Sequence, residues 1–168
     1  QRDWAGVALD ARVKVVRAAI AALREMNDEI VPEIAWSMGR PVRYGGEIGG
    51  VEERAYHMAD IASAALAPIV VEDSAQFHRY MVRKPAGLVL VMAPWNYPYL
   101  TAVNTIAPAL IAGNAVVLKH SSQTMLAGER LVEAFHAAGV PPALFQNLVL
   151  DHQTTAALIG RKSFGFVN

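Results

Sequence analysis

Residues 87–118 read GLVLVMAPWNYPYLTAVNTIAPALIAGNAVVL, and no charged side chain occurs among them. Two apolar runs of strand length, Gly87–Met92 and Ala115–Leu118, flank a segment of helix length, Pro98–Ile111. Continuous apolar strands are typical of a parallel sheet that is covered on both faces. A membrane span needs about 20 apolar residues, but prolines, a glycine and asparagines interrupt this stretch. We therefore predict a buried strand–helix–strand unit rather than a span.

The alternation of strands and helices continues after residue 118. The sequence predicts a helix, a strand, a short helix and the start of a fourth strand over Thr124–Ala138, Phe145–Val149, His152–Ile159 and Phe164–Val167. The full order βαβαβαβ indicates a Rossmann-like parallel sheet with right-handed crossovers. In open sheets of this kind, ligands bind beyond the carboxyl ends of the strands. Two loops, Ala93–Pro98 and Lys119–Thr124, are therefore the candidate ligand sites.

The chain before the sheet is predicted to be helical up to residue 66. An amphipathic stripe recurs at steps of three and four residues at Val13, Val16, Ile20 and Leu23. Two further helices and an exposed strand are expected over 28–38, 47–65 and 77–83. The predicted fold class is thus α/β, with a helical part, an extended segment and a parallel α/β part over 1–66, 67–84 and 85–168.

Composition excludes several classes of protein. The chain has 15 basic and 15 acidic residues, so it lacks the basic excess of a nucleic-acid-binding surface. Cysteine is absent, which excludes disulfides and thiolate zinc sites and fits a reducing, cytoplasmic location. The histidines show no metal-ligand spacing, so no metal site is expected. No apolar segment follows Arg2, so the first residues do not predict a signal peptide.

The glycine-rich segment Gly45-Gly46-Glu47-Ile48-Gly49-Gly50 is similar to a phosphate loop. A phosphate loop follows a strand and ends in Lys-Ser/Thr, whereas this segment follows a predicted helix and lacks that ending. We interpret it as a connector between helices. The nearby carboxylates Glu47, Glu52 and Glu53 are expected to form a solvated helix face.

The first candidate loop holds a tryptophan and an asparagine between two prolines, in the order Met92-Ala93-Pro94-Trp95-Asn96-Tyr97-Pro98. Each proline fixes a backbone φ angle, so the turn is expected to be stiff. An amide held rigidly at Asn96 can donate a hydrogen bond to a developing oxyanion. Asparagine is also a favoured helix N-cap, and the spacing alone favours that alternative for Asn96.

The second candidate loop is Leu118-Lys119-His120-Ser121-Ser122-Gln123-Thr124. A lysine at the end of a buried strand, followed by hydroxyls and a helix start, suits an anionic group or sugar hydroxyls. A solvated lysine with a serine cap explains the same residues, and it is favoured for this loop taken alone. The two loops follow adjacent parallel strands on the same side of the sheet, which favours a shared ligand site.

Several separated motifs share the order and spacing found in one known family: Lys84–Gly87, Met92–Pro98, Pro108–Asn114 and Val116–Lys119, with Gly39–Pro41 and Gly139–Pro141 as further landmarks. Over nearly its whole length the chain thereby resembles the aldehyde dehydrogenase superfamily. The resemblance implies a partial aldehyde dehydrogenase fold, namely part of the NAD(P)-binding domain without the catalytic domain. It also makes residues 67–84 part of an oligomerisation hairpin.

The resemblance implies roles for single residues. Asn96 matches the catalytic asparagine whose amide helps to hold the oxyanion of a thiohemiacetal. The ribose and nicotinamide end of NAD or NADP is then lined by Met92, Ala93, Pro94, Trp95 and Asn96. The adenosine ribose, or its 2′-phosphate, is held by the segment Lys119, His120, Ser121 and Ser122.

Some positions depart from the family pattern. Glutamate is frequent at the position of Ser122, and its carboxylate would repel a 2′-phosphate, so serine permits NADP. His120 stands where proline is common. Lys-His pairs occur in relatives that act on succinic semialdehyde, which indicates that substrate class. Ala143 and Leu150 replace glycines, which predicts divergence near the adenine end of the cofactor.

The activity implied by the resemblance is NAD(P)-dependent oxidation of an aldehyde to a carboxylic acid through a cysteine thiohemiacetal. The family's cysteine nucleophile and glutamate general base are not among these residues, so the chain alone is expected to be inactive. Two alternatives stay open: a non-catalytic dinucleotide-binding or structural relative, and a reductase that forms aldehydes from acyl-CoA or acyl phosphate. The expected partners are an aldehyde and further copies of the full-length protein, as a dimer or tetramer.

Overall fold

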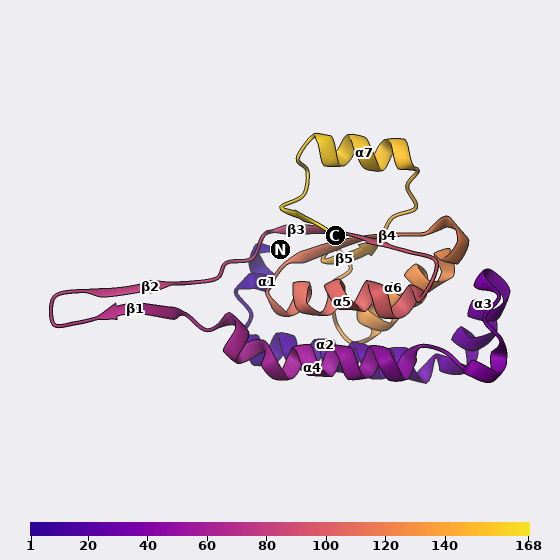
Figure 1. Cartoon of the computed structure of the whole chain (residues 1–168), viewed down its shortest axis with the longest axis horizontal. Helices are drawn as coiled ribbons and strands as arrows, with labels where there is room; N and C mark the ends of the chain where they lie inside the picture. The colour runs from indigo at the N-terminus through magenta and orange to yellow at the C-terminus, as the bar shows by residue number, and fades with distance from the viewer.

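A four-stranded parallel sheet lies at the centre of the protein in a computed structural model that describes residues 1–168 (Figure 1). Its strands lie in the order β5-β4-β3-β6 and span Leu88–Ala93 (β3), Ala115–His120 (β4), Phe145–Asn147 (β5) and Phe166–Val167 (β6). The chain therefore runs outward from β3 to β5 and returns on the other side of β3. The Rossmann-like parallel sheet expected from the sequence is confirmed, and its strand order reverses beside β3.

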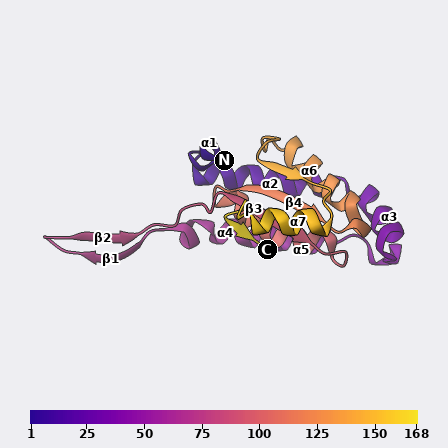
Figure 2. The same cartoon turned by 90° about the horizontal axis from the view of Figure 1, so that it is seen from above.

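The helices are distributed unequally over the two faces of the sheet. Helices α5 (Pro98–Ile111) and α6 (Met125–Ala137) cover one face, and α2 (Leu9–Glu25) and α4 (Ile48–Leu66) pack against them as an outer layer (Figure 1). Because α5 lies between two layers, it is apolar on almost every side, as a buried helix must be. Helix α7 (His152–Gly160) alone lies over the opposite face, and only its Thr155 is buried (Figure 2).

The bounds of the helices and strands around the two candidate loops are close to those predicted from the sequence. Helix α5 begins at Pro98 and ends at Ile111, as expected, and β4 extends two residues further than expected, to His120. Strand β5 is shorter than expected, because it ends at Asn147. The remaining helical elements are α1 (Arg2–Ala5), α3 (Asn27–Met38) and the short 3₁₀ turns η1 (Val42–Tyr44) and η2 (Ser122–Thr124).

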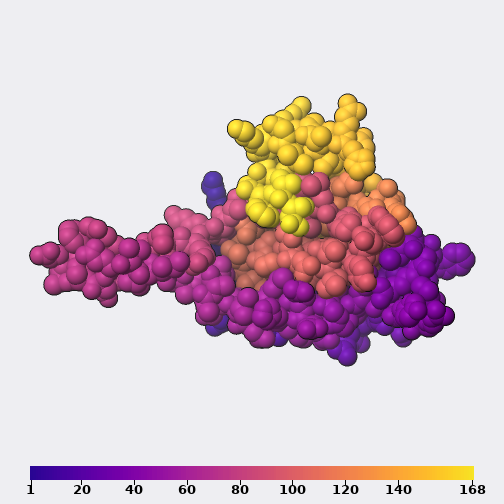
Figure 3. Space-filling model, viewed as in Figure 1, coloured from indigo at the N-terminus to yellow at the C-terminus, as the bar shows by residue number.

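A two-stranded antiparallel hairpin projects from the body between α4 and β3 (Figures 1 and 3). It pairs β1 (Ile69–Asp73) with β2 (His78–Met81), and β2 is the central part of the strand expected over 77–83. Large apolar side chains on both strands are exposed, including Val71 at 63% and Met81 at 56%. No helix of the structure combines the length and the apolar character that crossing a membrane would require.

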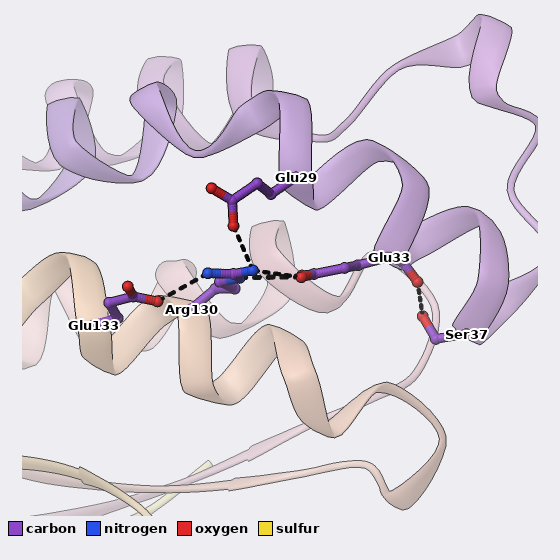
Figure 4. A network of polar contacts seen from close by, with 5 residues as sticks. All are labelled: Glu29, Glu33, Ser37, Arg130 and Glu133. Atoms are coloured by element: carbon purple, nitrogen blue, oxygen red, sulfur yellow. Dashed lines mark hydrogen bonds and ion pairs between the residues drawn. The ribbon is translucent and has the colours of Figure 1, made fainter.

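Arg130 on α6 binds two carboxylates of α3, Glu29 and Glu33, and a third on its own helix, Glu133 (Figure 4). The Arg130 guanidinium binds Glu33 through Nη2 at 2.6 Å and through Nε at 3.2 Å. It also lies 2.6 Å from Glu29 and 3.1 Å from Glu133. The side chains of Arg130 and Glu33 are 22% and 21% exposed, so this pair is shielded from water more than an ordinary surface pair.

We expect Arg130→Met to lower the free energy of unfolding by about 1 to 2 kcal/mol, because charged hydrogen bonds are lost and three carboxylates are left facing one another. Urea unfolding followed by circular dichroism measures this change. Lys14→Met removes an exposed helical cation and serves as the matched control. Equal midpoints for the two variants would show that the Arg130 contacts do not stabilise the fold.

Candidate functional site

The pairing of β3 with β4 brings the two candidate loops together. Met92 lies opposite Lys119, and Ala93 lies opposite His120, so both loops leave the same edge of the sheet as neighbours. Beyond this edge lies a groove of about 310 Å³ that is lined by Met92, Ala93, Pro94, Trp95, Lys119, Ser121, Ser122, His152 and Thr155. The groove thus contains every residue expected to contact a cofactor except Asn96 and His120.

The lining of the groove has two chemical ends. Lys119 supplies a cation, and Ser121 and Ser122 supply hydroxyls, whereas no carboxylate lines the groove. Met92, Pro94 and the half-exposed Trp95 supply an apolar wall. Phosphate or ribose groups suit the first end and a flat ring suits the second, so these residues fit part of a dinucleotide.

Asn96 lies in an exposed turn between β3 and α5. The N-cap residue of α5 is Tyr97, not Asn96, so the alternative that Asn96 caps this helix is wrong. Tyr97 has φ 53° and ψ 55°, a left-handed conformation that a non-glycine residue rarely adopts. With Pro94 and Pro98 on either side, the backbone of this turn has little freedom. The Asn96 amide is therefore held at the edge of the sheet rather than used inside the helix.

Glu47 caps α5 from outside the helix, and the sequence did not reveal this role. Its Oε2 accepts hydrogen bonds from the backbone N–H groups of Tyr99 (3.1 Å) and Leu100 (2.9 Å). The residue is only 6% exposed, so its assignment to a solvated face is wrong, whereas Glu53 is exposed as expected. Glu47 immediately precedes α4, where a side chain belongs to no regular helix face; this position is the signal that sequence reasoning could have used.

Burial raises the pKa of the Glu47 carboxyl above its usual range. The two backbone N–H donors and the charge of Arg40 oppose this shift without cancelling it. The second oxygen, Oε1, is buried without a hydrogen-bond partner. Phosphates in Rossmann-like folds usually bind at the N-terminus of the helix after the first strand. Here the Glu47 carboxyl group occupies that position.

His120 joins the two loops from inside the protein and does not line the groove. The ring is 5% exposed, with Nε2 at 3.1 Å from the carbonyl oxygen of Pro98 and Nδ1 at 3.2 Å from Oγ1 of Thr124. A carbonyl can only accept, so Nε2–H donates to Pro98 and the neutral ring accepts from Thr124 at Nδ1. Burial lowers the pKa of His120, which favours this neutral form.

Ser121 is the N-cap residue of η2, and its hydroxyl accepts a hydrogen bond from the backbone N–H of Gln123 at 3.3 Å. The serine cap expected for this loop is therefore present. Lys119 is half-buried and Ser122 is exposed, and both face the groove. The loop thus combines a local structural role with a side open to a ligand.

Helix α7 contributes His152 and Thr155 to the groove, and sequence analysis did not identify either residue. Asp151 caps this helix, because its Oδ1 accepts from the backbone N–H of Thr154 at 2.6 Å, which lowers the pKa of Asp151. The connection from β5 to β6 must cross the face of the sheet that α5 and α6 leave open. That topological rule is the signal from which sequence analysis could have placed α7 over the groove.

Comparison with known proteins identifies the family of this chain. The model of the aldehyde dehydrogenase family matches residues 1–168, so the chain belongs to the aldehyde dehydrogenase family. The helices and the parallel sheet match part of an aldehyde dehydrogenase fold.

Three solved structures illustrate the similarity. The NADP-dependent glyceraldehyde-3-phosphate dehydrogenase from Bacillus halodurans, complexed with NADP, is 29% identical, with a TM-score of 0.83 over 92% of this chain and 34% of that chain. Succinic semialdehyde dehydrogenase from Streptococcus pyogenes, complexed with NADP⁺, is 26% identical, with a TM-score of 0.81 over 90% and 33%. An NAD-dependent benzaldehyde dehydrogenase from Corynebacterium glutamicum is 25% identical, with a TM-score of 0.81 over 91% and 34%. The chain spans about a third of the length of these structures.

The buried carboxyl of Glu47 predicts a specific dependence of stability on pH. A carboxyl whose pKa is raised by folding binds its proton more tightly in the folded state, so its contribution to stability falls as pH rises through the raised pKa. We expect the unfolding free energy of the wild type, minus that of Glu47→Gln, to decrease from pH 4 towards pH 8 (about 4.5 being the ordinary carboxyl pKa). Urea unfolding at several pH values tests this, with Glu53→Gln as the control, and a difference that rises with pH would contradict it.

Proposed function

We propose that this chain is the N-terminal part of the cofactor-binding domain of an NAD(P)-dependent aldehyde dehydrogenase. In that enzyme an aldehyde, NAD(P)⁺ and water give a carboxylic acid, NAD(P)H and a proton. Family membership supports the reaction class, and similar structures were determined with NADP bound. The observation that carries the proposal is the placement of the Asn96 turn and the Lys119 groove at one edge of the sheet.

In this proposal the groove residues divide the cofactor between them. When bound, NAD(P) supplies the acceptor for the hydride that leaves the aldehyde carbon. Met92, Ala93, Pro94 and Trp95 line its ribose and nicotinamide end. Lys119, Ser121 and Ser122 hold the adenosine ribose or its 2′-phosphate, and His120 supports them from behind the loop.

Asn96 is the catalytic residue that this chain supplies. Its side-chain amide donates a hydrogen bond to the oxygen that becomes negative when a thiolate attacks the aldehyde carbon. The chain contains no cysteine, so the thiol comes from outside these residues, and we propose the same for the general base. We accordingly propose that the segment alone does not oxidise aldehydes. Its residues bind the cofactor and stabilise the oxyanion, but none of them attacks the aldehyde carbon.

The proposal also assigns a role to the hairpin β1–β2. A two-stranded ribbon is marginally stable alone, and its exposed apolar side chains favour pairing with another copy of the protein, as a dimer or tetramer.

A semialdehyde is our candidate substrate, since a succinic semialdehyde dehydrogenase is among the similar structures. A cytoplasmic location agrees with the absence of cysteine.

We expect Asn96→Ala in the complete enzyme to lower kcat by about 100- to 1,000-fold, because one oxyanion donor is lost. The Kd of the cofactor should change by less than about twofold, since the side chain acts on the aldehyde oxygen. Steady-state kinetics and cofactor titration measure the two quantities. Gln76→Ala, which truncates an exposed amide on the hairpin turn, is the control. An unchanged kcat in Asn96→Ala would remove Asn96 from the proposal.

We expect Ser122→Glu to shift the ratio of kcat/KM for NAD over NADP towards NAD by about tenfold or more, because a carboxylate beside the 2′-phosphate repels it. Ser122 is exposed and lines the groove together with Lys119, so the new carboxylate would face the ligand. The same substitution at exposed Ser63 on α4 controls for the added charge. A ratio that does not move would show that Ser122 is not near the 2′ position.

A further inference from the structure

The first turn of α5 is held by two side chains from other parts of the chain. The carboxylate of Glu47, at the start of α4, accepts from the N–H groups of Tyr99 and Leu100. The imidazole of His120, at the end of β4, donates to the carbonyl oxygen of Pro98. Consecutive residues of one turn are therefore anchored through both their N–H and their C=O groups.

These anchors lie immediately after the residue that the proposed reaction needs. Asn96 is two residues before Pro98 and is joined to it by Tyr97, whose left-handed conformation is unfavourable for a non-glycine residue. Such a conformation persists only where the surrounding contacts determine it. The Tyr97 carbonyl is itself fixed by the N–H and the hydroxyl of Thr101, at 3.0 and 2.7 Å. The backbone that aims Asn96 is thus set by α5, and α5 is set by Glu47 and His120.

Glu47 is placed in a way that its capping role alone does not require. A helix N-terminus is usually capped by its own N-cap side chain. Here Tyr97 provides no side-chain cap, and the cap comes from a residue that lies 52 and 53 positions away along the chain. Its Oε1 is buried without a partner, which is unfavourable for stability. A costly group at this position indicates a function beyond stability.

We propose that Glu47 is a positioning residue for Asn96, with His120 as the second anchor of the same turn. Glu47 touches neither substrate nor cofactor; it acts by fixing the first turn of α5 and thereby the direction of the Asn96 amide. This inference rests on the proposed oxyanion role of Asn96. Displacement of a catalytic group by about 1 Å costs up to about 100-fold in rate, so the hydrogen bonds from Glu47 have a measurable kinetic effect.

A double-mutant cycle in the complete enzyme tests the inference. Glu47→Gln keeps the size of the side chain and replaces the carboxylate by a neutral amide, whose oxygen is a weaker acceptor for the two N–H groups. It is combined with Asn96→Ala. We expect Glu47→Gln alone to lower kcat by about tenfold while KM for the cofactor stays within about twofold. In the Asn96→Ala background the same change should lower kcat by less than about twofold, because the group that Glu47 positions is gone.

Each outcome of the cycle decides between explanations. If Glu47→Gln lowers kcat equally in both backgrounds, Glu47 acts independently of Asn96 and the inference is wrong. If Asn96→Ala lowers kcat but Glu47→Gln does not, the inference fails and the proposed function stands. If Asn96→Ala leaves kcat unchanged, the proposed function of Asn96 fails, and this inference fails with it.

Two further variants separate positioning from general stability. Glu25→Gln, on the exposed end of α2, should leave kcat unchanged. His120→Phe removes the hydrogen bond to Pro98 with a ring of similar size, and it gives the same cycle if Glu47→Gln does not fold. We expect His120→Phe to lose its effect on kcat in the Asn96→Ala background as well. If Glu47→Gln and His120→Phe each lower kcat by the same factor with and without Asn96→Ala, the inference is wrong.

Discussion

Helix α5 is enclosed between the sheet and the outer helices α2 and α4, so its terminal N–H groups must be satisfied by the protein itself. The Glu47 carboxylate meets this constraint at Tyr99 and Leu100. The same contact fixes the relative positions of α4, α5 and the turn that carries Asn96. A polar group that is buried in this way has few alternative arrangements, because any other one would leave N–H groups or a carboxylate without partners.

The capped helix also changes where a ligand can bind. In the common Rossmann arrangement, phosphates take the free N-terminus of the first crossover helix. With Glu47 in that place, the cation that faces the groove at this edge of the sheet is Lys119, near the end of β4. His120 is hydrogen-bonded to the carbonyl oxygen of Pro98, so the Lys119 side and the Asn96 side of the candidate site are directly linked. The strand order is Rossmann-like, but the N-terminus of α5 is capped by Glu47 and is not free to bind a phosphate.

The two faces of the sheet differ in how completely they are covered. Helices α5 and α6 bury one face, and the ion pairs of Arg130 tie α6 to α3 at its margin (Figure 4). The other face carries only α7, whose His152 and Thr155 line the groove. The hairpin carries several exposed large apolar side chains, and others, including Met92 and Trp95, line the groove. In the proposed function the groove binds the cofactor and the hairpin pairs with another copy of the protein.

The sequence by itself determined the order of strands and helices, because continuous apolar runs such as those of β3 and β4 are stable only when both faces are covered. It also located the two loops, since the carboxyl ends of adjacent parallel strands must be neighbours. Tertiary structure alone decided that Glu47 is buried, that His120 points inward and that α7 lines the groove. Local patterns describe the face a residue presents within its own element. They do not state which distant N–H or carbonyl group will meet it, and here those partners lie 22 to 53 residues away.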